Sequence, residues 1–195
     1  MKILKKKYEK GLSLIEASMV LALSAIVVSG VMFYYQSASD SNKTQNTISE
    51  VMSTIAAING LYVGQSDYKG LNTTVLSHSS AIPDSYKSGD GNSIRNPFGG
   101  DLLIAPGDSN KNKYGITLTK IPKSSCLNIA SMNLGTSLVG VGTGLDTPQA
   151  GADTDPIKAP NDGTAKSKTL YKAITPADAN SMCDSDFNSI TYVMQ

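Results

Sequence analysis

The distribution of apolar and polar residues separates an apolar amino-terminal run from a mixed remainder. Residues 12–39 are predominantly apolar, and Glu16 is the only charged residue among them. The densest part, residues 17–35, is long enough to cross a hydrocarbon core of about 30 Å as a helix. A charged side chain within such a run costs roughly 2.5–3.5 kcal/mol on insertion scales. Something must therefore offset the charge of Glu16, or the helix must later leave the lipid.

The helix is predicted to continue beyond residue 39 as an amphipathic segment. This stretch contains no proline, and apolar residues recur in it at three- and four-residue steps. Such a stripe is expected to lie on a globular domain, with Asp40, Lys43, Asn46 and Glu50 on other faces. A helix over 12–62 would be about 76 Å long at 1.5 Å per residue, so its apolar half needs a membrane or the core of a polymer. The stripe consists of Ile48, Val51, Met52, Ile55, Ile58 and Tyr62.

The remainder of the chain predicts a small domain with helices and an antiparallel sheet. Residues 64–100 form a turn-rich connection with one short helix over 73–79. Strand-like segments follow, and the alternation of Ile116 and Leu118 with Thr117 between them predicts a half-buried antiparallel strand. The strands are expected over 101–106, 114–121, 137–142 and 189–194, the last as an edge or returning strand.

Two further helices are predicted from their end signals, one over 122–135 and one that follows Ile174. Each contains one cysteine, so a bridge between the two helices is geometrically plausible. The region between them, 143–169, is rich in Gly, Pro, Asp and Thr and is expected to be an exposed excursion. The signals are Ser124 or Ser125 as cap and Gly135 as stop for the first helix, and Thr175, Pro176 and Asp178 for the second.

Charge is concentrated at the amino terminus. The chain has 17 basic and 16 acidic residues, but five of the lysines precede Gly11, with Glu9 as the only acidic residue there. Without residues 1–11 the chain has 12 basic and 15 acidic side chains. No basic face is left that would favour nucleic acid. The lysines are better interpreted as a topology signal that keeps the leader cytoplasmic.

The two cysteines, Cys126 and Cys183, lie far apart and form no Cys-x-x-Cys pair. Their spacing gives little basis for zinc or an iron–sulfur cluster. An even number of cysteines beyond a membrane segment favours one disulfide formed in an oxidising compartment. Two buried free thiols are the alternative.

Other segments are weak candidates for ligand binding or catalysis. The glycine-rich stretch 140–144 lacks the Gly-Lys-Ser/Thr sequence of a phosphate-binding loop. Residues 184–195 begin like a calcium loop but lack its glycine and its final glutamate. His78, the single histidine, has no acid or cysteine at ligand spacing and is expected on the surface. We therefore expect no cofactor, no metal and no enzymatic activity.

The junction between the lysines and the apolar run narrows the interpretation of the amino terminus. A cleavable secretory signal has a shorter apolar region that ends in a small-x-small site, and an ordinary single-span anchor does not explain Glu16. Gly11, followed by Leu12 and by Glu16 at the fifth position after the glycine, resembles the type IV prepilin signal. The resemblance implies that a prepilin peptidase cuts between Gly11 and Leu12 and that Leu12 becomes N-methylated.

The position of Glu16 also has a physical rationale. Residues four apart share a helix face, so Glu16 lies one turn above the amino group of a mature Leu12. The positive end of the helix dipole favours an acid in this turn, and the ammonium group of a neighbouring subunit would compensate the carboxylate more strongly. The family resemblance implies that Glu16 docks a new subunit onto a growing fibre. Pairing within one subunit and pairing between subunits both remain open.

Beyond the signal, the whole chain is similar to the type IVb major pilins of bundle-forming pili. Agreement is strongest in KKYEKGLSLIE, GVMFYYQSASDSNK, NPFGG and ITPADA. The resemblance implies an α+β, type IV pilin fold: a long N-terminal α-helix packed on an antiparallel β-sheet, with a C-terminal region framed by a Cys126–Cys183 disulfide. The implied parts are a cleaved leader (1–11), a transmembrane and polymer-core half-helix (12–39), an amphipathic half-helix (40–63) and a globular head (64–195).

The same resemblance implies partners and a location. The precursor would lie in the inner membrane with its leader cytoplasmic and its head periplasmic. The mature chain would form a helical homo-oligomer that the pilus assembly machinery exports through an outer-membrane secretin as an extracellular fimbrium for cell adhesion. Two alternatives remain: a minor pilin or type II secretion pseudopilin with the same leader, and a membrane-anchored periplasmic binding domain whose leader match is accidental.

Overall fold

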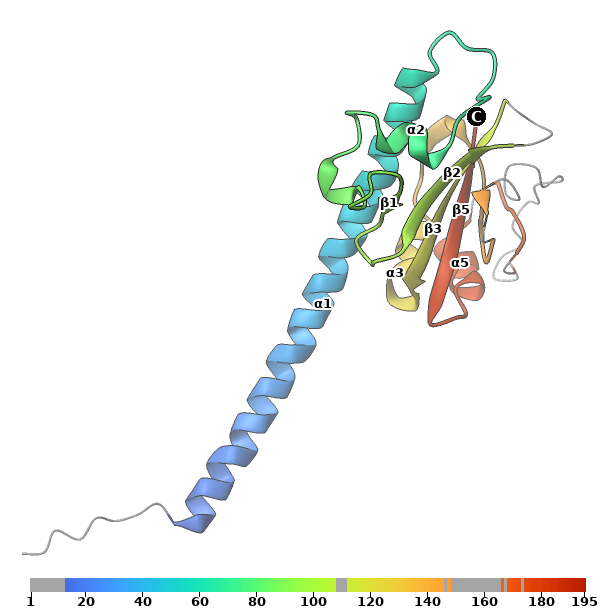
Figure 1. Cartoon of the computed structure of the whole chain (residues 1–195). Helices are drawn as coiled ribbons and strands as arrows, with labels where there is room; N and C mark the ends of the chain where they lie inside the picture. Colours follow the sequence, from blue (N-terminus) through green and yellow to red (C-terminus); the bar gives the residue numbers. More distant parts are fainter. Residues whose placement is uncertain (1–12, 108–111, 146, 149–165, 167, 173) are drawn as a thin grey trace, which may run out of the picture. The chain divides into compact units, whose positions relative to one another are not determined.

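The computed structural model describes residues 13–107, 112–145, 147–148, 166, 168–172 and 174–195 (Figure 1). The chain divides into two compact units between Ser39 and Asp40, and each unit is described by itself. The long first helix, α1 (Leu14–Leu61), contributes residues to both units.

The first unit is the apolar part of α1. Every side chain over 13–37 is exposed, although most are large and apolar, and the helix is long and apolar enough to cross a membrane. The hydroxyl groups of Ser18, Ser24 and Ser29 donate to carbonyl oxygens three or four residues earlier. These serines therefore satisfy their own hydrogen bonds and are compatible with apolar surroundings.

The second unit contains a five-stranded antiparallel sheet with the strand order β1-β2-β3-β5-β4. The last strand along the chain, β5, lies between β3 and β4, so of the two alternatives for 189–194 the edge strand is wrong and the returning strand is confirmed. Ile190 and Tyr192 of this strand are fully buried, and partners on both sides leave it no free edge. The strands are β1 (Ile94–Arg95), β2 (Asp101–Pro106), β3 (Tyr114–Pro122), β4 (Leu138–Thr143) and β5 (Phe187–Met194).

Strand β3 is buried on both faces, whereas its sequence predicts a half-buried strand. Thr117 is completely buried, and its hydroxyl lies 2.7 Å from that of Thr191 on β5. On the same face, a Cβ atom at Gly115 would lie 2.2 Å from the carbonyl oxygen of Pro148. Two threonines that bond to each other can be buried on a covered face of the sheet. Thr117 therefore does not mark a solvent-exposed face, although the alternation of apolar and polar residues predicted one.

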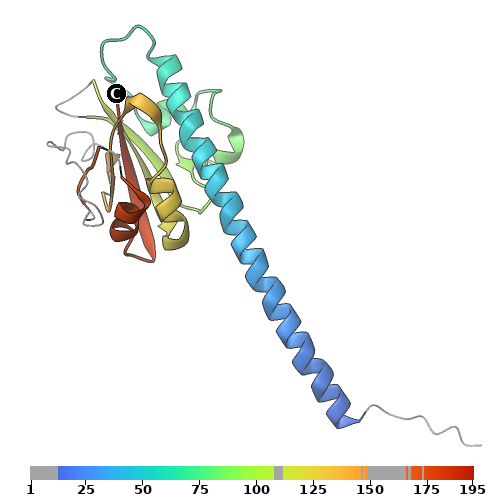
Figure 2. The same cartoon turned by 180° about the vertical axis from the view of Figure 1, so that it is seen from behind.

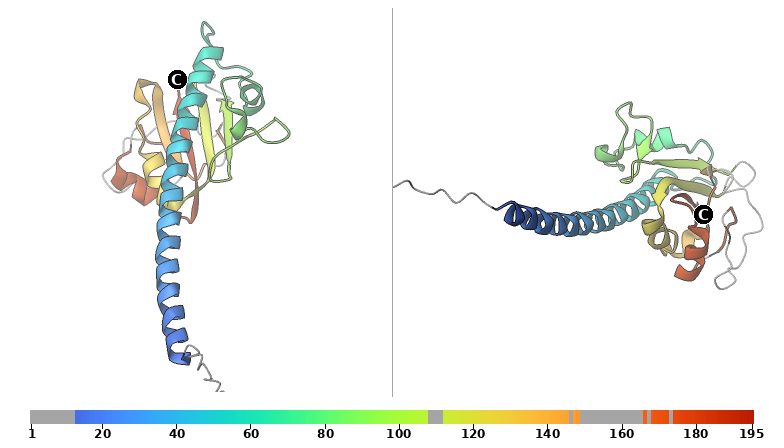
Figure 3. Two further views of the ribbon diagram at one scale, coloured as in Figure 1. Left: turned by 90° about the vertical axis from the view of Figure 1, so that its left-hand side faces the viewer. Right: turned by 90° about the horizontal axis from the view of Figure 1, so that it is seen from below.

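Helices cover the other face of the sheet. Figures 2 and 3 show the second half of α1 running across it between α2 and α3, and α5 packs against α3. Tyr192 on β5 donates its hydroxyl proton to the carbonyl oxygen of Ile129 at 2.5 Å. The Thr143 hydroxyl on β4 donates to the carbonyl oxygen of Met182 at 2.9 Å. These helices are α2 (Thr73–Ser77), α3 (Lys123–Ala130) and α5 (Pro176–Met182), and a 3-10 turn, η1 (Asp84–Tyr86), follows α2.

The predicted end signals of α5 are confirmed. The Thr175 hydroxyl accepts the amide of Asp178, and the Asp178 carboxylate accepts the amide of Thr175, with Pro176 in the first turn. This reciprocal arrangement is a capping box, and it satisfies amide groups that otherwise lack partners at a helix start.

The predicted end signals of α3 are wrong. The helix begins directly after Pro122 without a side-chain cap and ends at Ala130. The Lys123 amide donates instead to the carbonyl oxygen of Asp186 at 3.1 Å, so a contact distant in sequence replaces the local cap. Gly135 does not end α3; it has a φ of 78° and opens a 3-10 turn, η2 (Gly135–Ser137), before β4.

The buried face of the second half of α1, here called the buried seam, is partly polar. It consists of Thr44, Thr47, Glu50, Val51, Thr54, Ala57 and Ile58. The predicted stripe is right for Val51 and Ile58, which are fully buried. It is wrong for Met52, which is 51 % exposed, and for Glu50, which is buried although expected on another face. The Thr47 hydroxyl donates to the carbonyl oxygen four residues earlier at 2.9 Å, so this threonine packs without an outside partner. Apolar spacing alone therefore does not identify the buried face.

The carboxyl group of Glu50 is buried without a hydrogen-bond partner in the described part of the chain. Its side chain is 2 % exposed, and among the described residues neither of its carboxyl oxygens has a hydrogen-bond partner. The Thr54 hydroxyl, one turn later, is also buried and has no hydrogen-bond partner within the described ranges. Burial disfavours the charged form and raises the pKa of Glu50 to about 8. The carboxyl group is therefore predominantly protonated at neutral pH.

Glu50 should make the stability of the head depend on pH. In the unfolded chain Glu50 has its ordinary pKa of 4.5, and in the folded chain its pKa is about 8. Between these two pH values the folded state therefore retains the proton that the unfolded state has lost. Stability from this group is then highest below pH 4.5, falls as the pH rises toward 8 and is level above it. Glu50→Gln removes the titration at nearly constant size and should raise the melting temperature more at pH 8 than at pH 4.5.

Thermal unfolding followed by circular dichroism across this pH range checks the expectation. The surface variant Asp101→Asn is the matched control, because Asp101 is exposed. Melting curves of wild type and Glu50→Gln that differ by a constant amount at every pH would contradict it.

Candidate functional site: the helix start and the disulfide

The start of α1 places Glu16 over the first helical turn. The Ser13 amide donates to Oε2 of Glu16 at 2.9 Å, and the Ala17 amide donates to the carbonyl oxygen of Ser13 at 3.0 Å. The carboxylate thus folds back to a helix end where amide groups lack partners and the dipole favours an acid. Gly11 and Leu12, the predicted cleavage and methylation sites, lie outside the described residues.

The carboxylate of Glu16 is presented to the surroundings of the helix. Glu16 is exposed, like its neighbours up to residue 37. One amide donor compensates only part of a negative charge, and in apolar surroundings such a group attracts a cation strongly. The helix start can therefore accept a second, positively charged partner.

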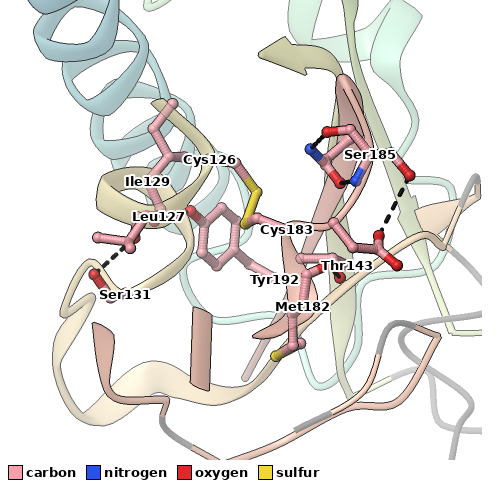
Figure 4. Close-up of a disulfide and its surroundings, with 11 residues drawn as sticks. Cys126, Leu127, Ile129, Ser131, Thr143, Met182, Cys183, Ser185 and Tyr192 are labelled. Carbon is pink, nitrogen blue, oxygen red and sulfur yellow. Dashed lines mark hydrogen bonds between the residues drawn. A yellow bond between two sulfur atoms is a disulfide. The ribbon is translucent and has the colours of Figure 1, made fainter. Parts of the chain in front are cut away.

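Cys126 in α3 and Cys183 at the end of α5 form a disulfide, with Cα atoms 6.0 Å apart (Figure 4). Both residues are buried, and the preference for a bridge over two free thiols is confirmed. Figure 4 shows Tyr192 beside the bridge and Met182 next to Cys183. The Tyr192 hydroxyl joins the sheet to α3, and the Met182 carbonyl joins α5 to the sheet. The disulfide therefore lies where α3, α5 and the sheet meet.

The chain between the two cysteines packs closely on β4. Val141 and Tyr171 exchange both backbone hydrogen bonds, at 2.8 and 2.9 Å. A Cβ atom at Gly142 would lie 2.7 Å from the carbonyl oxygen of Thr169. This close approach accounts for a glycine in the stretch 140–144 without a phosphate ligand. Most of the predicted excursion over 143–169 lies outside the described residues.

The residues considered from the sequence as metal ligands lie at a helix end and in a turn. His78 is exposed at the end of α2, as expected. Asn188 donates its side-chain amide to the carbonyl oxygen of Ser185 at 2.7 Å and accepts the Ser185 amide, which closes the turn before β5. Within the described ranges, no group of three or more His, Cys, Asp and Glu side chains could hold a metal ion.

Comparison with known proteins identifies the family. Residues 36–190 match the Bundlin family profile. The chain is 51 % identical to the major structural subunit of bundle-forming pilus from Escherichia coli O111:H- and 50 % identical to that from Escherichia coli O127:H6 (strain E2348/69 / EPEC). Each comparison covers 100 % of this chain and 98 % of the relative.

The chain belongs to the bundlin family.

The fold of this bundlin-family chain is the type IV pilin fold. The crystal structure of TcpA, a type IV pilin from the El Tor biotype of Vibrio cholerae, matches it with a TM-score of 0.56. The match covers 79 % of this chain and 99 % of that chain at 15 % identity, so it shows the fold alone. The predicted long helix, antiparallel sheet and disulfide-framed C-terminal region are confirmed.

Removal of the disulfide should destabilise the bundlin-family head. The cysteines are 57 positions apart, and closing such a loop is worth on the order of 4 kcal/mol in the chain-entropy model. That is a large share of the roughly 5–15 kcal/mol by which a domain is stable. Cys126→Ala combined with Cys183→Ala should lower the free energy of unfolding by about 2–4 kcal/mol in a denaturant titration.

Thiol labelling provides the control for this titration. In the native chain neither cysteine should react with an alkylating reagent, whereas Cys126→Ser should leave Cys183 reactive after unfolding. Two freely alkylated cysteines in the undegraded native chain, or a double variant as stable as wild type, would contradict the stabilising role of the bridge.

Proposed function

We propose that this chain is the major structural subunit of a type IVb, bundle-forming pilus that supports bacterial aggregation and adherence. The observation that supports the proposal most directly is the identity of one half, over the full chain, to two proteins with that name. The aligned length includes the leader, both halves of α1 and the head. The chain would act as a fibre component without enzymatic activity.

The first unit supplies a physical reason for polymerisation. Apolar surface is unfavourable in water at roughly 25 cal/mol per Å², and the side chains over 13–37 are exposed. Lipid would cover them before assembly, and the same helices of neighbouring subunits would cover them afterwards. If each subunit uses two different surfaces for its two neighbours, such contacts repeat without closing and produce a helical filament.

Processing would connect the membrane state with the fibre state. A prepilin peptidase would cut between Gly11 and Leu12, remove residues 1–11 and leave an N-methylated Leu12. The basic leader favours a cytoplasmic amino terminus, and the disulfide favours an oxidising, periplasmic location for the head. The assembly machinery and an outer-membrane secretin would then export the fibre from the inner membrane to the cell exterior.

Glu16 would direct the docking of each new subunit. Within its own turn the carboxylate accepts the Ser13 amide, which is a neutral donor. The ammonium group at Leu12 of a neighbouring subunit would add a full positive charge, which is worth more at low dielectric than in water. A correctly placed neighbour would therefore be favoured over a misaligned one.

Sheared surface fibres provide the test of this function. Mass spectrometry of the abundant fibre protein should find a chain that begins at methylated Leu12, because the glycine before it leaves room for the peptidase. Gly11→Val should leave an uncut precursor in the inner membrane. A mature chain from Gly11→Val, or a trace amount of wild-type chain in the fibres, would contradict the processing site or the role as major subunit, respectively.

Glu16→Gln separates insertion from assembly. Glutamine keeps the size and the hydrogen bonding of the side chain but removes the charge, so the precursor should still insert and be cut. Fibre number in electron micrographs should fall by about tenfold or more, since one tenfold step corresponds to about 1.4 kcal/mol of docking free energy. The matched control is Ser18→Ala in the same turn, whose hydroxyl bonds within the helix. Normal fibre numbers for Glu16→Gln would show that the acid only starts the helix.

A further inference from the structure

Two lysines adopt a backbone conformation that is unfavourable for residues with a Cβ atom. Lys120 has a φ of 56° and Lys168 a φ of 62°, and they are the only non-glycine residues with positive φ in the described part of the chain. Lys120 lies where the register between β3 and β5 shifts, between Leu118 and Ile121. Glycine or asparagine would adopt these conformations with less strain. The lysine side chains therefore need an explanation.

Both lysines line one pocket next to the start of β5. The pocket has a volume of about 350 Å³, at the lower end of the range of roughly 300–1,000 Å³ for small-ligand sites. Ser185, on the turn after Cys183 (Figure 4), lines it together with Phe187 and Ser189. Phe187 is 68 % exposed, so the residues that line the pocket include two lysines, two serines and an accessible phenylalanine.

Among the described residues, no carboxylate lines this pocket. Among the described residues the ion pair between Lys87 and Asp84 is the only one, so neither pocket lysine is neutralised by a described acid. Asp184 and Asp186 belong to the same turn, and the Asp184 carboxylate accepts the Ser185 hydroxyl. Their charges oppose a long-range attraction of anions. Binding would therefore depend on direct contact with the two ammonium groups.

We propose that this pocket binds an oxyanion, a carboxylate, sulfate or phosphate group, on a ligand whose flat or apolar part lies against Phe187. The ammonium groups of Lys120 and Lys168 would donate charge-assisted hydrogen bonds to the oxyanion. The ring of Phe187 would contribute apolar contact area. Unfavourable backbone conformations cluster at residues that contact ligands. A role in binding the oxyanion would therefore account for lysine, instead of glycine or asparagine, at both positions. The site is independent of the pilus function.

Nuclear magnetic resonance of the full chain in an uncharged detergent tests the proposal with three probes. Inorganic phosphate carries the oxyanion alone, benzyl alcohol carries the ring alone, and phenyl phosphate carries both. Phosphate should shift the amide resonances of Lys120, Lys168 and Phe187 saturably, and phenyl phosphate should bind about threefold to tenfold more tightly. Benzyl alcohol should give no saturable shift. Equal binding of benzyl alcohol and phenyl phosphate, or shifts that do not saturate with either phosphate, would overturn the proposal.

Variants then assign the binding to the two lysines. Lys120→Asn with Lys168→Asn removes both charges, and asparagine tolerates positive φ, so the fold should be kept. This double variant should weaken phenyl phosphate binding by about tenfold or more, whereas the matched surface variant Lys69→Asn should bind like wild type. Unchanged binding by the folded double variant would overturn the proposal, and an equal loss in Lys69→Asn would show that binding is not specific to the pocket.

Discussion

Helix α1 carries 48 residues through surroundings with opposite requirements, because its first part exposes apolar side chains and its second part lies on the sheet of the head. Polar groups within it cost free energy in either surroundings unless they form hydrogen bonds. Glu50 and Thr54 in the buried part have no partner among the described residues, but other hydroxyl residues meet this constraint by donating to the preceding turn. Ser24 does so in the apolar part, and Thr47 does so in the buried seam. The same local device makes polar residues acceptable in lipid-like and protein-like surroundings.

The two glutamates on this helix lie in environments that act differently on their carboxyl groups. Glu16 lies in the first turn, where an amide donor and the helix dipole stabilise its charge. Glu50 lies in the interior of the head without a partner among the described residues, and it avoids the cost of a buried charge by keeping its proton. One acid is thus available for an interaction with a cation, while the other behaves as a neutral core residue.

The sequence predicts those elements whose signals are local, and it is less successful where contacts distant in the chain decide. The capping box of Thr175 and Asp178 is complete within four residues, and it is correct. The start of α3 depends on the carbonyl group of Asp186, which lies more than sixty positions away, and no local signal reveals it. Burial of Glu50 and the shared pocket of Lys120 and Lys168 could not be predicted for the same reason, since periodicity describes one element at a time. The roles that the prepilin resemblance implies for Gly11, Leu12 and Glu16 stay predictions, and Gly11 and Leu12 lie outside the described residues.

The central position of β5 has a consequence for the time at which the head can fold. Its residues follow those of the other four strands along the chain and are synthesised after them, yet they separate β3 from β4 and supply partners to both. Before β5 has left the ribosome, the sheet has a gap in its middle, and contacts between residues as far apart as Thr117 and Thr191 cannot form. Sheets that depend on such distant pairings close slowly. The amino-terminal helix is therefore complete well before the sheet, and a chain truncated before β5 would carry a finished helix attached to an unfinished sheet.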